Sequence, residues 1–476
     1  MRLSDKHLHH RVLLVAYHFP PIGGSGVQRP TKFVKYLPRF GWHSYIICTD
    51  QPFGDGSGGW DETLLADIPQ GTSVWRIPTP QPHPVQWLAR RVGWKRRNLQ
   101  VSGTSPTGEA VPIPARANLA KRLRRLILAP LYWIEQPPVD PALYWSLRIV
   151  PFAKRIIEQE NIDVILTTVP PFSVLLSGYL LKILTKRPWV ADFRDPWTDN
   201  TFTYFPTRLR LWLDRHLERF LVSQSDAVIS VTEPWLEQLR GKVSATARRK
   251  PFVLIPNGWD RDDFPELGVG YEQSPAPNEN KRPIVLLHPG SAYLEEPLPL
   301  LRAMERLDDE TLSGLLFHFV GYLHPIDRAR IQASPFADRF LLQSQRIPHP
   351  EALRLMRNAH VLLLLLLRKG PGASSGKIFE YMVSGRPVLA IGRGVAEQII
   401  RECGIGATVH PDDPVELAGL LYEAVHDYAG FVRRYYRPNW EAINSYERSV
   451  LTARLAEVLD TVCMKYDAHC RRSAQD

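Results

Sequence analysis

The sequence predicts an α/β protein with two doubly wound domains, each a parallel sheet between layers of helices. Short apolar runs of strand length recur along the chain, and helical patterns separate many of them. Several of these runs end in loops rich in glycine and proline, where ligands of such domains bind. A length of 476 residues exceeds what one typical hydrophobic core serves, so we expect two domains.

The chain opens with the pattern of a βαβ unit. Residues 12–16 form the first predicted strand, a helix follows over 27–37, and a second strand covers 44–48. The loop between the first strand and the helix contains Gly23 and Gly24. Glycines allow close backbone approach, and the free N–H groups of a helix start receive phosphate well.

The rest of the first half continues the alternation after a less regular stretch, residues 51–145. Further strands are expected at 163–167, from Trp189 onward, at 227–230 and at 252–255, and helices at 143–159, 172–184, 208–224 and 233–240. The strand from Trp189 ends in a loop that holds Asp192, Arg194 and Asp195. Polar residues at a strand end indicate a site, because ligands bind there. In the alternative reading, the two carboxylates only pair with Arg194 and cap the next helix.

The second half begins after a polar, proline-containing link. Its elements are expected as strands at 284–288, 317–320, 339–343, 361–367 and 387–391, and as helices at 297–306, 350–358, 414–428 and 440–459. Gly404 and Gly406 predict a short turn. The turn at Asn257–Gly258 is a plausible hinge between the halves.

The stretch 370–390 organises the second half. A loop of small residues leads into a short helix that carries Lys377 and Glu380, three positions apart and therefore on one face. A cation for phosphate beside a carboxylate for sugar hydroxyls suits a nucleotide-sugar. The loop could also be an ordinary connection and the pair an ordinary solvent-facing pair.

The net charge of +10 predicts anionic partners. The positive charge is concentrated between Asp67 and Glu135, where Glu109 is the single acidic residue. Two basic clusters, Trp87–Arg97 and Leu119–Leu128, combine arginines with tryptophan or leucine, which predicts contact with an anionic membrane surface. The alternative is a helix packed on its own domain with a solvated basic rim. No nucleic-acid-binding motif accompanies the charge, so we expect no nucleic acid as partner.

The 4 cysteines show no metal-ligand or disulfide spacing, and no apolar run reaches the roughly 20 residues that span a bilayer. We therefore expect a cytoplasmic protein, peripheral at the inner face of the membrane.

Taken together, these loops resemble those of the GT-B glycosyltransferases, specifically the retaining family 4 enzymes. The resemblance rests on Gly23–Gly26, Asp192–Trp197, Ile255–Gly258, Lys377–Tyr381 and Gly385–Val388. It implies two Rossmann-like domains facing a central cleft. We expect an acceptor domain at 1–265, with an irregular basic segment at about 75–135, a linker at 266–283, a nucleotide-sugar domain at 284–435, and a terminal helix at 436–476 that returns to the first domain.

The resemblance also assigns residues. Glu380 is similar to the second carboxylate of the family's E-x7-E motif and should hold the donor ribose, but Gly372 stands where the first carboxylate is expected. The family usually has a cation soon after Gly290 to neutralise the leaving diphosphate, whereas this chain has Leu294–Glu296. Lys377, Arg368, Lys369 or the loop at Gly24 could compensate. The donor-binding residues are therefore expected to be Gly23, Gly24, Gly290, Ser291, Ser375, Gly376, Lys377 and Glu380.

The expected activity is transfer of a sugar from a nucleotide diphosphate donor, with retention, to a lipid-linked or polysaccharide acceptor in cell-envelope glycan biosynthesis. Lys377 and helix N-termini would stabilise the leaving diphosphate, so neither a metal nor another cofactor is required. The expected catalytic residues are Asp192, Arg194, Asp195 and Lys377. The two departures from the family pattern leave open an inactive GT-B protein that serves as a binding or scaffold subunit.

Overall fold

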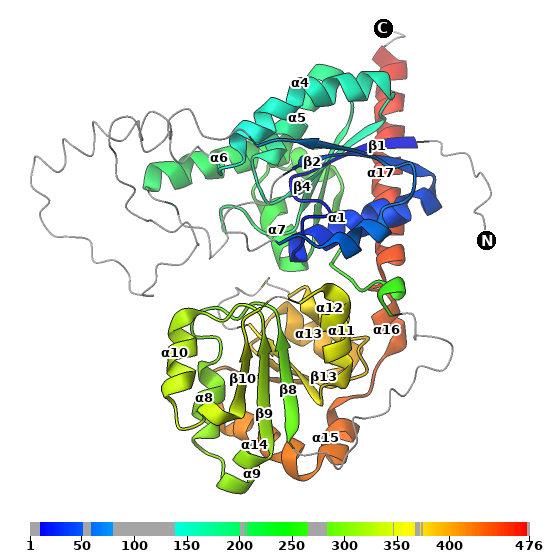
Figure 1. Ribbon diagram of the computed structural model, residues 1–476. Coiled ribbons are helices and arrows are strands. Elements are labelled where there is room, and N and C mark those ends of the chain that lie inside the picture. The colour runs from blue at the N-terminus through cyan, green and yellow to red at the C-terminus, as the bar shows by residue number, and fades with distance from the viewer. Residues whose placement is uncertain are drawn as a thin grey trace, which may run out of the picture. The chain divides into compact units, whose positions relative to one another are not determined.

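The computed structural model describes residues 10–50, 59–79, 139–199, 205, 207–264, 283–345, 347–366, 372 and 375–473. The basic clusters Trp87–Arg97 and Leu119–Leu128 lie outside these residues, as does nearly all of the predicted linker. The chain forms two compact units, one of residues 1–255 with 454–476 and one of residues 256–453 (Figure 1). Within the described ranges, no helix combines the length and apolar character that crossing a membrane requires.

The first unit contains a parallel sheet of seven strands in the order β3-β2-β1-β4-β5-β6-β7. Its strands are β1 (His10–Ala16), β2 (Trp42–Thr49), β3 (Ser73–Ile77), β4 (Val164–Val169), β5 (Trp189–Phe193), β6 (Ala227–Ser230) and β7 (Phe252–Leu254). The direction in which strands are added reverses between β1 and β4. The loops after these two strands therefore diverge, which is where doubly wound sheets bind ligands.

Helices on both faces bury this sheet. They are α1 (Ser25–Tyr36), α4 (Leu143–Gln159), α5 (Val174–Thr185), α6 (Arg208–Gln224) and α7 (Glu233–Gly241), with short 3-10 turns η1 (Leu37–Phe40), η2 (Glu62–Asp67) and η3 (Ala247–Arg249). Helix α5 lies close to the sheet at Gly178, where a Cβ atom would stand 2.3 Å from Nε1 of Trp189. A glycine is thus required for this close packing.

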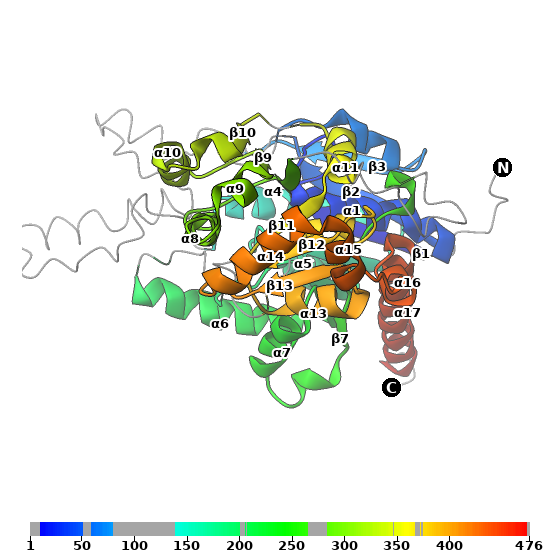
Figure 2. The ribbon, with the colours of Figure 1, turned by 90° about the horizontal axis from the view of Figure 1, so that it is seen from below.

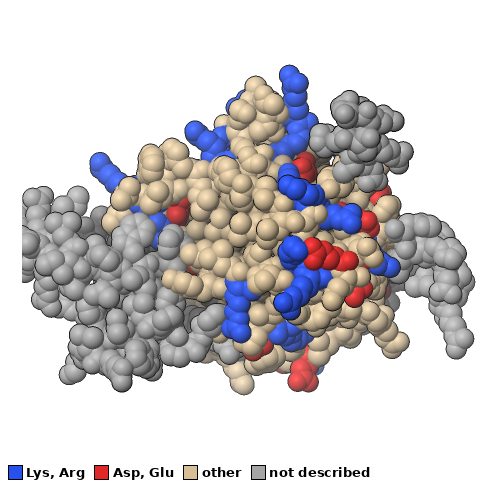
Figure 3. Space-filling model, turned by 90° about the horizontal axis from the view of Figure 1, so that it is seen from above, with Lys and Arg blue, Asp and Glu red and all other residues tan. Residues whose placement is uncertain are grey.

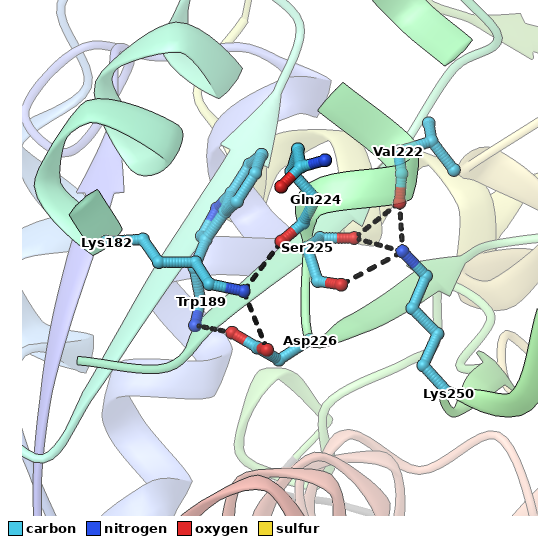
Figure 4. A network of polar contacts seen from close by, with 7 residues as sticks. All are labelled: Lys182, Trp189, Val222, Gln224, Ser225, Asp226 and Lys250. Atoms are coloured by element: carbon cyan, nitrogen blue, oxygen red, sulfur yellow. Dashed lines mark hydrogen bonds and ion pairs between the residues drawn. The ribbon is translucent and has the colours of Figure 1, made fainter. Parts of the chain in front are cut away.

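A polar network surrounds the C-terminal end of helix α6 at the amino-terminal edge of the sheet (Figure 4). Lys250 Nζ donates to the carbonyl oxygens of Val222 and Ser225, the latter at 2.9 Å. Lys182 Nζ donates to the carbonyl of Gln224 and to Asp226, both at 2.7 Å. Two lysines thus donate to carbonyls that have no partner within the helix, and burial lowers the pKa of Lys250 to about 7.

The second unit contains a parallel sheet of six strands in the order β10-β9-β8-β11-β12-β13. Its strands are β8 (Ile284–Pro289), β9 (Leu315–Val320), β10 (Phe340–Gln343), β11 (Val361–Leu365), β12 (Val388–Ile391) and β13 (Gly406–Val409). The order of strand addition reverses here between β8 and β11.

The helices of this unit are α8 (Leu298–Met304), α9 (Asp309–Ser313), α10 (Pro325–Ala333), α11 (His349–Asn358), α12 (Lys377–Tyr381), α13 (Val395–Cys403), α14 (Pro414–His426), α15 (Tyr428–Tyr435) and α16 (Trp440–Asn444), with 3-10 turns η4 (Arg261–Asp263) and η5 (Ala337–Arg339). Successive residues of β11 point to opposite faces. Leu363 packs in the core with α8 and α14, whereas Leu362 packs in the core with α11, α12 and α13 (Figure 2).

The structure corrects two predictions for the last hundred residues. Gly406 does not lie in a turn but in strand β13, where it pairs with Val388. The helix expected at 440–459 is divided into α16 and α17 (Arg448–Ser473), because Tyr446 turns its carbonyl to accept a hydrogen bond of 3.1 Å from the Trp259 N–H.

Candidate active site

His288, at the carboxyl end of β8, is the buried centre of a polar cluster in the second unit. Its Nδ1 lies 3.0 Å from the carbonyl oxygen of Leu363, and its Nε2 lies 3.0 Å from Nζ of Lys377. Nε2 also lies 3.3 Å from the carbonyl oxygen of Ser291, and Nδ1 donates to the carbonyl of Leu363, because a carbonyl can only accept. His288 therefore contacts Lys377 and helps to hold its ammonium in place.

Gly290 makes room for this ammonium. It has φ +101°, and a Cβ atom there would lie 2.8 Å from Cε and 3.2 Å from Nζ of Lys377. The Lys377 ammonium also donates to the carbonyl of Ser291 at 3.3 Å. The loop after β8 lacks a cation of its own, but the structure places the cation of α12 directly against it. An ammonium at a strand end is suited to bind an oxyanion.

Glu380 stands on the same short helix as Lys377. Its Oε1 lies 2.9 Å from Nε2 of His349, the first residue of α11, and its side chain is 25% exposed. The carboxylate is thus oriented by a neighbour and still accessible to a ligand. Ser375 and Gly376 precede the helix, and a Cβ atom at Gly376 would meet no atom within 4 Å. Helix α12 has only 5 residues, so Lys377 is a stronger source of positive charge here than the helix dipole.

Asp192, on β5 of the first unit, is fully buried. Arg29 of α1 donates to both of its oxygens, with Nη2 at 2.7 Å from Oδ1 and Nε at 3.0 Å from Oδ2, and Thr168 donates to Oδ2 at 2.8 Å. A carboxylate with these partners positions α1 against β4 and β5. This geometry favours a structural role for Asp192 over direct contact with a substrate.

Arg194 connects three loops at the carboxyl edge of the first sheet. Its guanidinium donates to the carbonyl oxygens of Gly26, Val169 and Pro170, the last at 2.5 Å. Burial lowers the pKa of Arg194, while the carboxylates of Asp195 and Asp192 raise it. Arg194 therefore shapes the edge of the sheet on which the neighbouring Asp195 lies.

Asp195 and His18 are the partly exposed titratable groups next to Arg194. His18 follows β1, and burial together with the charge of Arg194 lowers its pKa to about 4. It is therefore neutral at pH 7. Gly24 begins α1 with φ +114°, and a Cβ atom there would meet no atom within 4 Å, so its backbone is open to a ligand.

The predicted site residues thus form two groups. Gly290, Ser291, Ser375, Gly376, Lys377 and Glu380 lie at the carboxyl edge of the second sheet, and Gly23, Gly24, Asp192, Arg194 and Asp195 lie at that of the first. Their assigned roles stay predictions.

Comparisons with known proteins agree with this architecture. The sequence profile of the glycosyl transferase 4-like domain matches residues 91–258. Over these residues, about a third of the chain, the protein is similar to glycosyltransferases of the family 4 type. No curated protein sequence matches it significantly.

Solved glycosyltransferase structures share the fold of this GT-B protein at low sequence identity. HepE from Anabaena, in complex with UDP and glucose, has a TM-score of 0.60 at 14% identity, covering 95% of this chain and 100% of its own. A glycosyltransferase from Rickettsia africae has a TM-score of 0.59 at 15% identity, covering 95% and 98%. Sucrose-phosphate synthase from Thermosynechococcus elongatus has a TM-score of 0.54 at 16% identity, covering 95% and 99%.

Three residues of the candidate site were missed in the sequence. His288 left a signal, because a histidine at the end of an apolar strand points to a functional position. His349 lies 31 positions before Glu380, and Arg29 lies 163 positions before Asp192. Pairings of this range follow from the topology, which no local pattern encodes.

Proposed function

We propose that the protein moves a sugar from a nucleoside diphosphate donor, with retention, to a lipid-linked or polysaccharide acceptor in cell-envelope glycan biosynthesis. The observation that carries the proposal is the placement of Lys377 and Glu380 on one face of α12, beside the loop after β8. The solved HepE structure with UDP-glucose supports a nucleotide-sugar as the donor class.

In this proposal Lys377 contacts the diphosphate and Glu380 accepts hydrogen bonds from the ribose hydroxyls. The backbone of Gly290, Ser291 and Gly376 surrounds the phosphates. Electrostatic stabilisation of a leaving group is commonly worth about 3 kcal/mol per donor, and Lys377 supplies it without requiring a metal or another cofactor. His288 acts as a positioning residue, because it holds the ammonium at 3.0 Å.

The acceptor side of the reaction is assigned to the first unit. The bond between the anomeric carbon and the diphosphate oxygen breaks, and the acceptor oxygen bonds to that carbon on the same face of the sugar. Asp195 orients the acceptor hydroxyl, whose proton leaves with the diphosphate. Arg194 and the buried Asp192 hold the loop, and the backbone at Gly24 approaches the donor phosphates, next to Gly23, whose N–H donates to the carbonyl of Gly59 at 2.8 Å.

A lipid-linked acceptor agrees with the basic composition of Trp87–Arg97 and Leu119–Leu128. We assign these segments to peripheral contact with the inner face of the membrane, where anionic headgroups attract Lys and Arg.

Ligand-induced thermal shifts test the donor site. Nucleoside diphosphates and nucleotide-sugars of each base would be added to the wild type, to Glu380→Ala and to the control Glu402→Ala, whose side chain is exposed on α13. We expect the ligands of one base to raise the melting temperature of the wild type and of the control. In Glu380→Ala most of this rise should be lost. An equal rise in all three proteins would contradict the assignment of Glu380.

The scaffold alternative is favoured by Gly372, which is buried where the family has a carboxylate. To distinguish an active transferase from a scaffold, the release of free nucleoside diphosphate would be measured with the donor that binds. A donor that binds and is turned over supports the transferase, and a donor that binds without turnover under any acceptor supports the scaffold.

A further inference from the structure

Helix α6 turns four large apolar side chains outward and its two acidic side chains inward, while Leu221 and Val222 pack in the core. Leu209 is 59% exposed and Trp212 53%, and Leu213 and Phe220 are exposed as well. At 100° per residue these four occupy one side of the helix. A helix of a soluble protein usually buries its apolar side, so this arrangement is the reverse of the ordinary one.

The buried side of α6 is held by ion pairs. Nε of Arg210 lies 2.9 and 3.0 Å from the two oxygens of Asp214. Glu218 accepts from Nζ of Lys242 at 2.7 Å and from the hydroxyl of Thr198 at 2.5 Å. The pair of Arg210 and Asp214 lies within the helix, whereas the contacts of Glu218 fix the helix on the first unit. The outward apolar side chains are left for another role.

The exposed charges of α6 are all positive. Arg208, Arg215 and Arg219 are exposed and lie along one edge of the apolar side, whereas the two acidic residues of the helix, Asp214 and Glu218, are buried. The outward face thus combines a row of arginines with tryptophan, leucine and phenylalanine.

The apolar surface continues onto α5. The ring of Phe220 lies 5.0 Å from that of Tyr179, and one turn further along α5 Ile183 and Leu184 are exposed. Lys186 follows and is also exposed. Figure 3, which views the molecule from above, shows a largely uncharged surface with Lys and Arg side chains and some Asp and Glu among them.

We propose that the outward face of α6, with the end of α5, docks on an anionic lipid surface. Leucine, tryptophan and phenylalanine would enter the boundary between headgroups and acyl chains, and the arginines would contact phosphates. This site consists of other residues than the segments Trp87–Arg97 and Leu119–Leu128, and it does not depend on the donor site.

Charge decides against two other occupants. A second copy meeting the same face by two-fold symmetry would bring arginine rows together. Residues 80–138 of the chain are themselves rich in Lys and Arg, with Glu109 and Glu135 as their acidic residues. An anionic partner is the one that complements this face.

Vesicle co-sedimentation of the full chain tests the proposal. The vesicles contain phosphatidylcholine with or without about 30% phosphatidylglycerol. The test variants are Trp212→Ser with Leu213→Ser, and Arg215→Glu with Arg219→Glu. The control is Val415→Ser with Arg433→Glu, which changes an exposed apolar and an exposed basic residue of the second unit. Melting temperatures confirm that every variant is folded.

We expect the wild type and the control to bind the anionic vesicles, and to bind them more weakly at high salt. Each α6 variant should bind at least about tenfold more weakly, since an arginine at such a surface is worth about 1 kcal/mol. Equal binding of the α6 variants would overturn the proposal. Three other results would also overturn the proposal. The first is a wild-type dimer that Trp212→Ser disrupts, and the second is binding of the protein to polyglutamate but to no vesicle. The third is a thiol in Leu209→Cys that resists chemical modification in the absence of lipid. No donor is present, so failure here is distinct from failure of the proposed function.

Discussion

Lys377 shows how one side chain takes over a position that the preceding loop leaves without charge. The loop after β8 continues from Gly290 into Glu295 and Glu296, and Glu296 is buried with its Oε2 accepting from the Tyr293 N–H at 2.8 Å. The positive charge arrives instead from α12, held by His288. Space for it exists because residue 290 has no side chain.

Gly290→Ala should therefore weaken binding of a nucleoside diphosphate by about tenfold or more, because the new methyl group would displace Lys377 and strain a residue with φ +101°. Binding of the nucleoside alone should change little. Gly419→Ala on α14 is the matched control, since its Cβ meets no atom within 4 Å. Calorimetric titration of the three proteins measures the difference, and equal losses for nucleoside and diphosphate would contradict it.

His18 predicts a pH dependence of stability. Its pKa of about 4 in the folded protein lies below the ordinary 6.5, so the unfolded chain binds more protons between these values. The contribution of neutral His18 to the free energy of unfolding is fully present above pH 6.5. It is lost as the pH drops toward 4, by at most about 1.4 kcal/mol per pH unit.

His18→Gln should remove this part of the acid sensitivity. Its melting temperature should exceed that of the wild type increasingly as the pH falls from 6.5 to 4.5. His216→Gln, an exposed histidine on α6, serves as the control and should follow the wild type. Parallel curves for His18→Gln and the wild type would show that His18 carries no such effect.

At the residue scale the sequence identified which residues gather at the strand ends, but not what surrounds them. Asp192 and Asp195 look alike in the sequence. In the structure Asp192 is enclosed by Arg29 and Thr168, whereas Asp195 is partly exposed. Burial of a carboxylate depends on partners from distant segments, and these become visible once the sheet is assembled.

Helix α6 gives a prediction at the scale of one element. Lys250→Met removes the donor to the carbonyls of Val222 and Ser225 and should destabilise the first unit by about 1–2 kcal/mol. Lys154→Met, which removes an exposed pair with Glu158, should cost under about 0.5 kcal/mol. Urea unfolding of both variants compares them, and similar losses would show that the end of α6 does not need Lys250.

Most of the longer elements followed from local patterns. The limits of α4, α6 and β6 coincide with those expected from apolar periodicity, and the fold class is confirmed. Strand β3 was missed because its five residues are partly exposed and lie in an irregular stretch. Gly406 was assigned to a turn because glycine favours turns, but a Cβ there would lie 2.0 Å from the Val388 carbonyl, so the close approach of two strands requires it.

Amide hydrogen exchange tests the proposed function at the scale of the whole molecule. A nucleoside diphosphate should slow exchange in the loop after β8 and in α12, which are parts of residues 256–453. The complete nucleotide-sugar should add protection around Gly24. Protection by the nucleoside diphosphate confined to the first unit would reverse the assignment of the donor to the second.

Helix α17 has a consequence for how the protein is made. Its residues from 454 onward belong to the first unit, where Leu455 and Leu459 are buried and Asp460 accepts a hydrogen bond of 3.0 Å from Trp42. During translation the second unit is therefore complete in sequence before the first has all its parts. Until residues 454–473 leave the ribosome, the surface around Trp42 stays uncovered, so the half that is synthesised first is the last that can finish folding.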